Sequence, residues 1–229
     1  MTFSIVARCP RTGQVGVGAL TAMVGGGKLV SHARAGVGAV GSQATMNPYY
    51  GFDGLRLMAD GVPAPEALRR VVEADPARSL RQCGMVDAEG GADAWTGEGT
   101  EDWSGHLVGD GWAVQGNRLV GPETLEATAG EFLAHPEREL AERLLLALEA
   151  GEATGADRKG EQSGVIYVMD TEEYPLWDVR IDHADDPAAA LRALVDEFAS
   201  QLIPQVRGLP TREDPVGELA RELLPDVDG

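Results

Sequence analysis

Residues 2–8, TFSIVAR, decide how the fold of this chain begins. Phe3 and Ile5 alternate with Ser4 and Val6, as successive side chains do in a β-strand. The turn residues CPRTG at 9–13 come next, and the alternation resumes in QVGVGAL at 14–20. We therefore expect an antiparallel hairpin that starts at the second residue of the chain.

Further strands and helices follow in blocks rather than in strict alternation. Runs bounded by turn residues predict strands at 36–44, 80–87, 92–96, 105–108, 112–115, 164–169 and 176–181. Helical spacing of apolar residues predicts helices at 54–60, 65–74, 123–135, 137–150 and 187–202. We expect the strands between residues 80 and 115 to form one meander. The order of the blocks predicts an α+β fold, in which two antiparallel sheets pack together with helices outside.

The composition limits the partners of this protein. Hydrophobic residues make up 43% of the 229 residues, which is enough to fill the core of one ordinary domain. Lys and Arg number 19 and Asp and Glu number 37, so the formal net charge is −18. This negative field repels phosphate backbones and anionic lipids, and we expect neither nucleic acid nor a membrane as a partner. No apolar run is long enough for a membrane-spanning helix, and the first residues do not have the pattern of a signal peptide. We therefore expect a cytoplasmic protein.

The end of the chain differs from the rest in composition. Residues 204–229 are acidic and contain several prolines, so we expect a C-terminal tail attached to a domain formed by residues 1–203. The edge strands of the expected sandwich favour self-association. We therefore expect a homodimer.

The sequence lacks a complete dinucleotide-binding motif and a complete metal-binding motif. GVGAVG at 36–41 has the glycine spacing of a dinucleotide-binding turn, but no helix is predicted to follow it. The four histidines form no pair at i, i+4, and no cysteine lies at ligand spacing from them. We expect neither a cofactor nor a metal ion.

Thr2 is the residue whose position suggests chemistry. Initiator methionine is generally removed when the second residue is as small as threonine, and removal would leave Thr2 as the first residue of a strand. A free α-amine has a pKa of about 8 and would activate the hydroxyl group of the same residue. Many proteins begin with Met-Thr without such chemistry, so a catalytic and a non-catalytic interpretation both stay open.

Several motifs occur in a fixed order: TFSIVAR at 2–8, ARAGVGAV at 33–40, QA at 43–44 with NPYYG at 47–51, VGDG at 108–111, VQGN at 114–117, and DRKG at 157–160 with QS at 162–163. Together they resemble the family known as domain of unknown function 1028, from Thr2 to about Leu202. Proteins of that family look like N-terminal-nucleophile (Ntn) hydrolases. The resemblance implies a four-layer αββα sandwich that is Ntn-hydrolase-like, and amide hydrolysis as the class of reaction.

The resemblance also implies roles for residues near the nucleophile. In this class of enzyme the Thr2 hydroxyl attacks a carbonyl carbon and the Thr2 amine carries the proton to the leaving amine. Arg34 lies about as far after the nucleophile as a lysine of proteasome-type relatives, and a cation there would lower the pKa of the amine. A surface contact or the binding of a substrate carboxylate is an equal alternative for Arg34. Thr21 falls where those relatives use an aspartate, and its hydroxyl can orient a neighbour without supplying charge.

Candidate donors for an oxyanion hole come from two segments. They are the backbone N–H groups near Gln43 and Ala44, and the side-chain amide of Asn117. Asn117 alternatively takes a turn conformation after Gly116. Ser163 either orients the Thr2 amine or caps a strand.

The expected function is hydrolysis of a small amide or ureido C–N bond by Thr2. The alternative is a catalytically silent protein of the same fold that binds a ligand or takes part in an assembly. Smaller residues at Met23 and Val24, where family members carry aromatic side chains, predict a wide entrance to the site, so a relative's substrate does not transfer to this chain.

Overall fold

The structure, a computed structural model, describes residues 1–100, 102–156 and 160–223. Its strands are β1 Thr2–Arg8, β2 Val15–Thr21, β3 Ser31–Arg34, β4 Gly38–Ala44, β5 Arg81–Asp87, β6 Ala92–Thr96, β7 Trp103–Gly109, β8 Trp112–Leu119, β9 Ser163–Met169 and β10 Trp177–Ile181. They form a six-stranded sheet of order β10-β9-β2-β1-β8-β7 and a four-stranded sheet of order β3-β4-β5-β6. All neighbouring strands are antiparallel.

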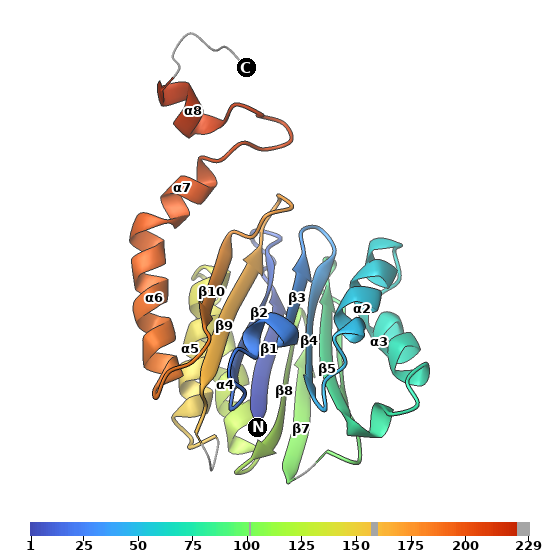
Figure 1. Cartoon of the computed structure of the whole chain (residues 1–229). Coiled ribbons are helices and arrows are strands. Elements are labelled where there is room, and N and C mark those ends of the chain that lie inside the picture. Colours follow the sequence, from blue (N-terminus) through green and yellow to red (C-terminus); the bar gives the residue numbers. More distant parts are fainter. Residues whose placement is uncertain (101, 157–159, 224–229) are drawn as a thin grey trace.

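Helices cover the outer face of each sheet. The helices of the described residues are α1 Gly27–Val30, α2 Tyr49–Ala59, α3 Ala64–Glu73, α4 Glu123–Ala134, α5 Leu140–Glu152, α6 Pro187–Gln201, α7 Ile203–Arg207 and α8 Gly217–Leu223, of which five form the two outer layers. Helices α4, α5 and α6 lie on the six-stranded sheet, and α2 and α3 lie on the four-stranded sheet (Figure 1). The α+β sandwich expected from the sequence is confirmed, with four layers in the order helix, sheet, sheet, helix.

The alternation in β1 follows from this layering, because both faces of the strand are buried. Phe3 and Ile5 pack against the helices in the largest core cluster. Val6 points the other way and packs between the two sheets with Ala39 and Val86 of the four-stranded sheet. The hairpin predicted from residue 2 is present, with β1 and β2 paired from Thr2 opposite Thr21 to Arg8 opposite Val15.

The prediction of one meander between residues 80 and 115 is wrong. Strands β5 and β6 belong to the four-stranded sheet, whereas β7 and β8 belong to the six-stranded sheet. The reason is that the two hairpins bury their apolar residues against different helices. Met85 of β5 packs with α2 and α3, and Val114 of β8 packs with α4 and α5. Turn spacing carries no information about this choice.

Two short elements in the glycine-rich region, α1 and β3, are absent from the sequence prediction, because four-residue elements carry too little periodicity to be recognised. Helix α2 also begins earlier than expected, at Tyr49. The other predicted strands and helices correspond to β4, β9, β10, α3, α4, α5 and α6. No helix in the described ranges is long and apolar enough to cross a membrane.

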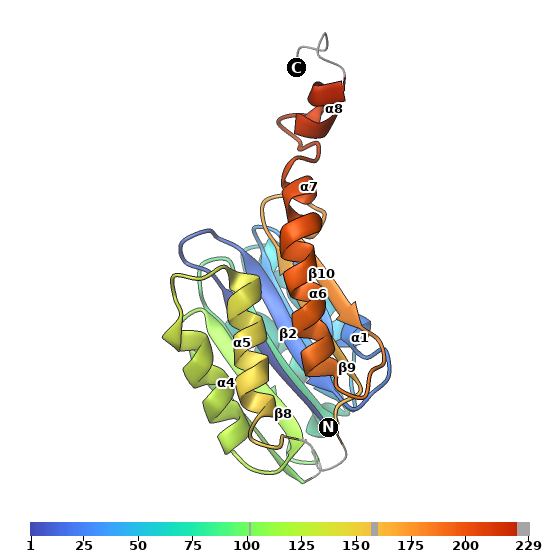
Figure 2. The same cartoon turned by 90° about the vertical axis from the view of Figure 1, so that its left-hand side faces the viewer.

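The C-terminal segment extends beyond the layers, with α7 and α8 following α6 away from the sheets (Figure 2). Ile203 at the start of α7 is buried in the core. Arg207 forms an ion pair with Glu139 at 2.6 Å, and Tyr174 Oη donates to the carbonyl oxygen of Pro210 at 3.1 Å. The division into a domain of residues 1–203 and a tail of residues 204–229 stays a prediction, and residues 224–229 lie outside the described ranges.

Candidate active site

A cleft of about 600 Å³ opens at the end of the sandwich where β1 begins. We call it the Thr2 cleft. Its described lining residues are Met1, Thr2, Thr21, Ala22, Met23, Ala44, Thr45, Met46, Leu80, Gly99, Thr100, Asn117 and Arg118. Four of the predicted site residues, Thr2, Thr21, Ala44 and Asn117, therefore line one cleft.

Strand pairing brings the predicted residues into a row. Thr2 of β1 lies opposite Thr21 of β2 on one side and opposite Asn117 of β8 on the other. Thr21 in turn lies opposite Ser163 of β9. These four residues thus lie side by side across the six-stranded sheet, although Thr2 and Ser163 are 161 positions apart in the sequence.

The Thr2 hydroxyl is held in place by its neighbours. Its Oγ1 lies 2.7 Å from Thr21 Oγ1 and donates to the carbonyl oxygen of Met1, also at 2.7 Å. The same carbonyl oxygen accepts from Thr21 Oγ1 and from the Ala22 N–H, each at 3.1 Å. Removal of Met1 would take away this acceptor and leave the Thr2 amine next to the two hydroxyl groups.

Two side-chain amides contact the main-chain carbonyl group of Thr2. Gln43 Nε2 donates to the Thr2 carbonyl oxygen at 3.2 Å, and Asn117 Nδ2 approaches the same oxygen at 3.4 Å. Both nitrogens also donate to Gln82 Oε1, at 2.8 and 3.0 Å. All three amides are buried. Gln43 and Asn117 therefore position Thr2, and the Asn117 amide is already used for this purpose.

The amide network continues between the two sheets through residues that the sequence analysis did not single out. Gln115 Nε2 donates to Ser4 Oγ, and Ser4 Oγ donates to Gln43 Oε1, each at 2.6 Å. Gly84 leaves the room for Gln115, since a Cβ atom there would lie 2.1 Å from Gln115 Oε1. The sign of this network in the sequence is that glutamine and serine occur within strands whose other residues are mostly apolar. Polar side chains at such positions need hydrogen-bond partners.

Strained backbone borders the cleft on both sides. Among the described residues other than glycine, Ala44, Asp102 and Arg118 have positive φ, and Ala44 (66°) and Arg118 (58°) line the cleft. Such conformations cost about 1–3 kcal/mol each and concentrate at functional sites. The turn conformation considered for Asn117 belongs to Arg118, the next residue.

The structure does not bring Arg34 to the cleft. Arg34 is exposed and lies opposite Gly38 at the start of β4, whereas the cleft is reached at Ala44, the end of β4. Six strand residues at about 3.3 Å each separate these two ends by roughly 20 Å. The direction of β3 therefore places Arg34 away from Thr2, which a count of residues along the chain does not reveal.

Ser163 shapes the entrance to the cleft and does not contact Thr2. Its hydroxyl donates to the carbonyl oxygen of Met23 at 2.7 Å and accepts from the Gly26 N–H at 3.3 Å. Met23 and Val24 in this loop are 45% and 57% exposed. Residues 157–159 of the DRKG motif lie outside the described ranges.

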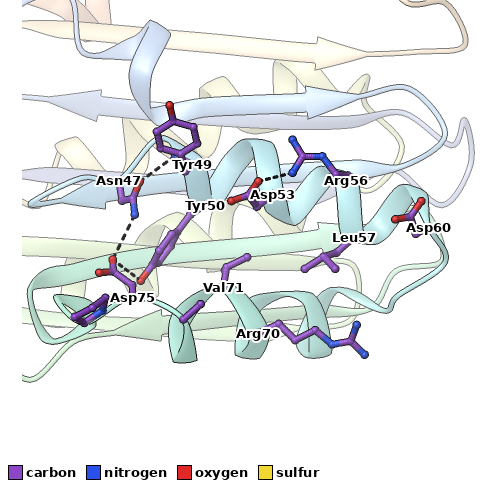
Figure 3. A pocket seen from close by; sticks show the side chains of 12 residues that line it. Asn47, Tyr49, Tyr50, Asp53, Arg56, Leu57, Asp60, Arg70, Val71 and Asp75 are labelled. Atoms are coloured by element: carbon purple, nitrogen blue, oxygen red, sulfur yellow. Dashed lines mark hydrogen bonds and ion pairs between the residues drawn. The ribbon is translucent and has the colours of Figure 1, made fainter.

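A second hollow, of about 570 Å³, lies between α2 and α3 and contains a buried carboxylate (Figure 3). Asp75 accepts from Tyr50 Oη at 3.1 Å, from Asn47 Nδ2 at 3.4 Å and from Arg81 Nε at 2.9 Å. Arg81 Nη1 donates to the carbonyl oxygen of Thr45. Asp75 therefore holds the segment that follows Ala44 in the wall of the Thr2 cleft.

Replacing Asp75 by asparagine is expected to destabilise the fold by about 1–3 kcal/mol at pH 7, because charge-assisted hydrogen bonds are lost. Burial raises the pKa of Asp75, but hydrogen bonds from the Ala77 N–H and Arg81 outweigh this and lower it to about 2. Since the unfolded value is about 4, the stabilisation is present above pH 4 and lost as the pH falls to about 2.

Urea unfolding of both proteins between pH 7 and pH 2 tests this prediction. The difference in stability should shrink as the pH falls, and a difference that is constant with pH would contradict it. Asp60→Asn, at an exposed carboxylate on the same hollow, is the control and should change stability by less than about 0.5 kcal/mol.

Comparison with known proteins assigns the chain to a family. The model of a family of unknown function, DUF1028, matches residues 2–191. The chain belongs to this family. It is similar to a DUF1028 protein from Silicibacter pomeroyi of known crystal structure, with 29% identity over 94% of this chain and 98% of that chain and a TM-score of 0.86. No curated protein matches this DUF1028 chain.

The family resemblance predicted from the ordered motifs is thus confirmed. Within the ranges described, no three His, Cys, Asp or Glu side chains are grouped so that they would hold a metal ion. The chemistry available at the Thr2 cleft consists of hydroxyl groups, side-chain amides, main-chain N–H groups and the guanidinium of Arg118.

Proposed function

We propose that this protein is an N-terminal-nucleophile hydrolase that cleaves a small amide or ureido C–N bond. The observation that carries the proposal is the placement of Thr2 Oγ1 in a cleft, 2.7 Å from Thr21 Oγ1, with the Thr2 carbonyl held by Gln43. A nucleophile needs a fixed hydroxyl and an adjacent base. The Thr2 amine would be that base once Met1 is removed.

The proposed reaction proceeds in two steps. Thr2 Oγ1 attacks the carbonyl carbon, its proton passes to the Thr2 amine and then to the leaving nitrogen, and the C–N bond breaks. Water then attacks the resulting ester, which releases the acid and restores Thr2. Thr21 Oγ1 orients the hydroxyl. Main-chain N–H groups beside Ala44, whose strained conformation borders the cleft, are the proposed donors to the oxyanion.

The intact mass of protein made without an N-terminal tag in its native host tests the first requirement. We expect the mass to lack one methionine residue, because a side chain as small as that of Thr2 permits removal of Met1. Quantitative retention of Met1 would contradict the proposal, since the amine of Thr2 would then be part of a peptide bond.

The alternative is a catalytically silent protein that binds a ligand or takes part in an assembly. With Met1 in place the Thr2 hydroxyl donates to the Met1 carbonyl oxygen, and the Thr2 nitrogen is part of a peptide bond and cannot act as a base. Retained Met1 together with ligand binding in the Thr2 cleft would select this alternative.

The proposal includes a small-molecule substrate, a cytoplasmic location and a homodimer. The cleft, of about 600 Å³, has the volume of small-molecule sites. Sedimentation velocity at micromolar concentration tests the oligomeric state, and a single species of 24.2 kDa would contradict the dimer.

A further inference from the structure

The Thr2 cleft differs in charge from the protein that surrounds it. The chain carries 37 acidic and 19 basic residues, with a formal net charge of −18. None of the described residues that line the cleft is Asp or Glu, and Arg118 is the one ionisable side chain among them. The described lining thus contains a cationic side chain and no carboxylate, which is compatible with an anionic ligand.

A β-bulge places Arg118 at the cleft. Trp103 pairs with Leu119 and Ser104 with Asn117, so Arg118 is the extra residue in β8. Its φ of 58° is unfavourable for a residue with a side chain. Bulges beside active sites change the direction of a side chain. Here the bulge sets an exposed arginine directly after Asn117, which lies opposite Thr2.

The other guanidinium close to the cleft serves the structure. Arg81 Nε donates to Asp75 at 2.9 Å and Nη1 to the carbonyl oxygen of Thr45. Among the residues that the structure describes, Arg118 is the cation in the lining itself. A guanidinium has five N–H donors, so contacts of Arg118 within the chain are compatible with binding of a further group. The planar fork of N–H groups matches a carboxylate.

We propose that Arg118 binds a carboxylate of the substrate, so that the substrates are small N-acyl or ureido compounds that carry an acid group. This inference rests on the proposed function for the bond that is cleaved. The binding of the acid group itself does not require catalysis. The two parts can therefore be tested separately.

The test is a calorimetric titration of the full-length Thr2→Ala protein, with loss of Met1 verified by mass, so that no turnover occurs. The probes are N-carbamoylglycine and N-acetylglycine, each compared with its neutral amide. We expect the acids to bind at least tenfold more tightly than the amides, because a charge-assisted pair contributes about that factor. Arg118→Gln should remove this difference, and Arg118→Lys should restore part of it.

Arg138→Gln is the matched control, because it removes the same charge from an arginine two residues before α5, where the side chain is 47% exposed and outside the cleft. It should leave the preference for acids unchanged. Equal binding of acids and amides, no binding of either, or a full preference for acids in Arg118→Gln would overturn the inference.

Hydrolysis assays on the processed wild-type chain separate the two proposals. Cleavage of neutral amides with no dependence on Arg118 would support the proposed function and overturn the inference. Binding of acids that depends on Arg118, without hydrolysis of any probe, would support the inference and count against the proposed function. Melting temperatures of all variants show whether each protein is folded.

Discussion

Replacing Thr2 by alanine is expected to lower amide hydrolysis by a factor on the order of 10³ or more while the protein stays folded. The variant still loses Met1, and it keeps the amine but has no oxygen that can attack a carbonyl carbon. Loss of a catalytic nucleophile has effects of at least this size. The side chain is small and makes one hydroxyl contact with Thr21, so the stability should fall by about 1 kcal/mol.

The measurement is the hydrolysis rate of a panel of amides and ureido compounds with equal amounts of folded protein. Thr2→Ser keeps an attacking hydroxyl and should retain measurable activity. Thr21→Val removes the orienting hydroxyl but leaves the nucleophile, so its rate should lie between those of the parent and Thr2→Ala. Wild-type activity in Thr2→Ala would end the assignment of Thr2 as the nucleophile.

The largest effect on stability is expected from Gly38→Ala. A Cβ atom at this position would lie 2.3 Å from the carbonyl oxygen of Val86 and 3.1 Å from Asp87 Cα. Both neighbours are main-chain atoms of β5, which pairs with β4, so they cannot move without breaking the sheet. The φ of Gly38, 156°, is also unfavourable for alanine. We expect a loss of about 3–5 kcal/mol, from overpacking and backbone strain together.

Urea unfolding measures this loss, and Gly130→Ala is its control. Gly130 lies in α4 with no neighbouring atom within 4 Å of an added Cβ. Alanine there should increase stability by about 0.5–1 kcal/mol, because glycine is the weaker helix former. A Gly38→Ala protein as stable as the parent would show that the two strands tolerate a wider separation. Because the two substitutions are expected to change stability in opposite directions, a general effect of replacing glycine by alanine cannot explain both results.

Local patterns predicted those parts of the fold that depend on neighbouring residues. The alternation of Phe3 and Ile5 in residues 2–8 is sufficient to predict β1, because successive side chains of a strand point to opposite faces. The proline at residue 65 and the apolar spacing after it identified α3 within one residue of its bounds. The order of the blocks was sufficient for the α+β class.

The candidate site was only partly predictable. Thr2 was recognised from its place in the sequence, and Thr21, Ala44 and Asn117 from a resemblance to a family. Arg34 was placed by its distance along the chain, and this failed because the direction of β3 carries Arg34 away from Thr2. Arg118 was missed, since a bulge depends on the register between β7 and β8 and leaves no local signal.

The sequence by itself determined most of the strands and the longer helices, the acidic character of the protein, its family and the residue that begins β1. Only the tertiary structure decided which hairpin joins which sheet, that Gln43, bonded to Gln82, holds Thr2 from the opposite sheet, and that Arg118 lines the cleft. The physical reason is the range of the interactions. Periodicity and turn chemistry act over a few residues, whereas the site depends on contacts such as that of Thr2 with Asn117, 115 positions away.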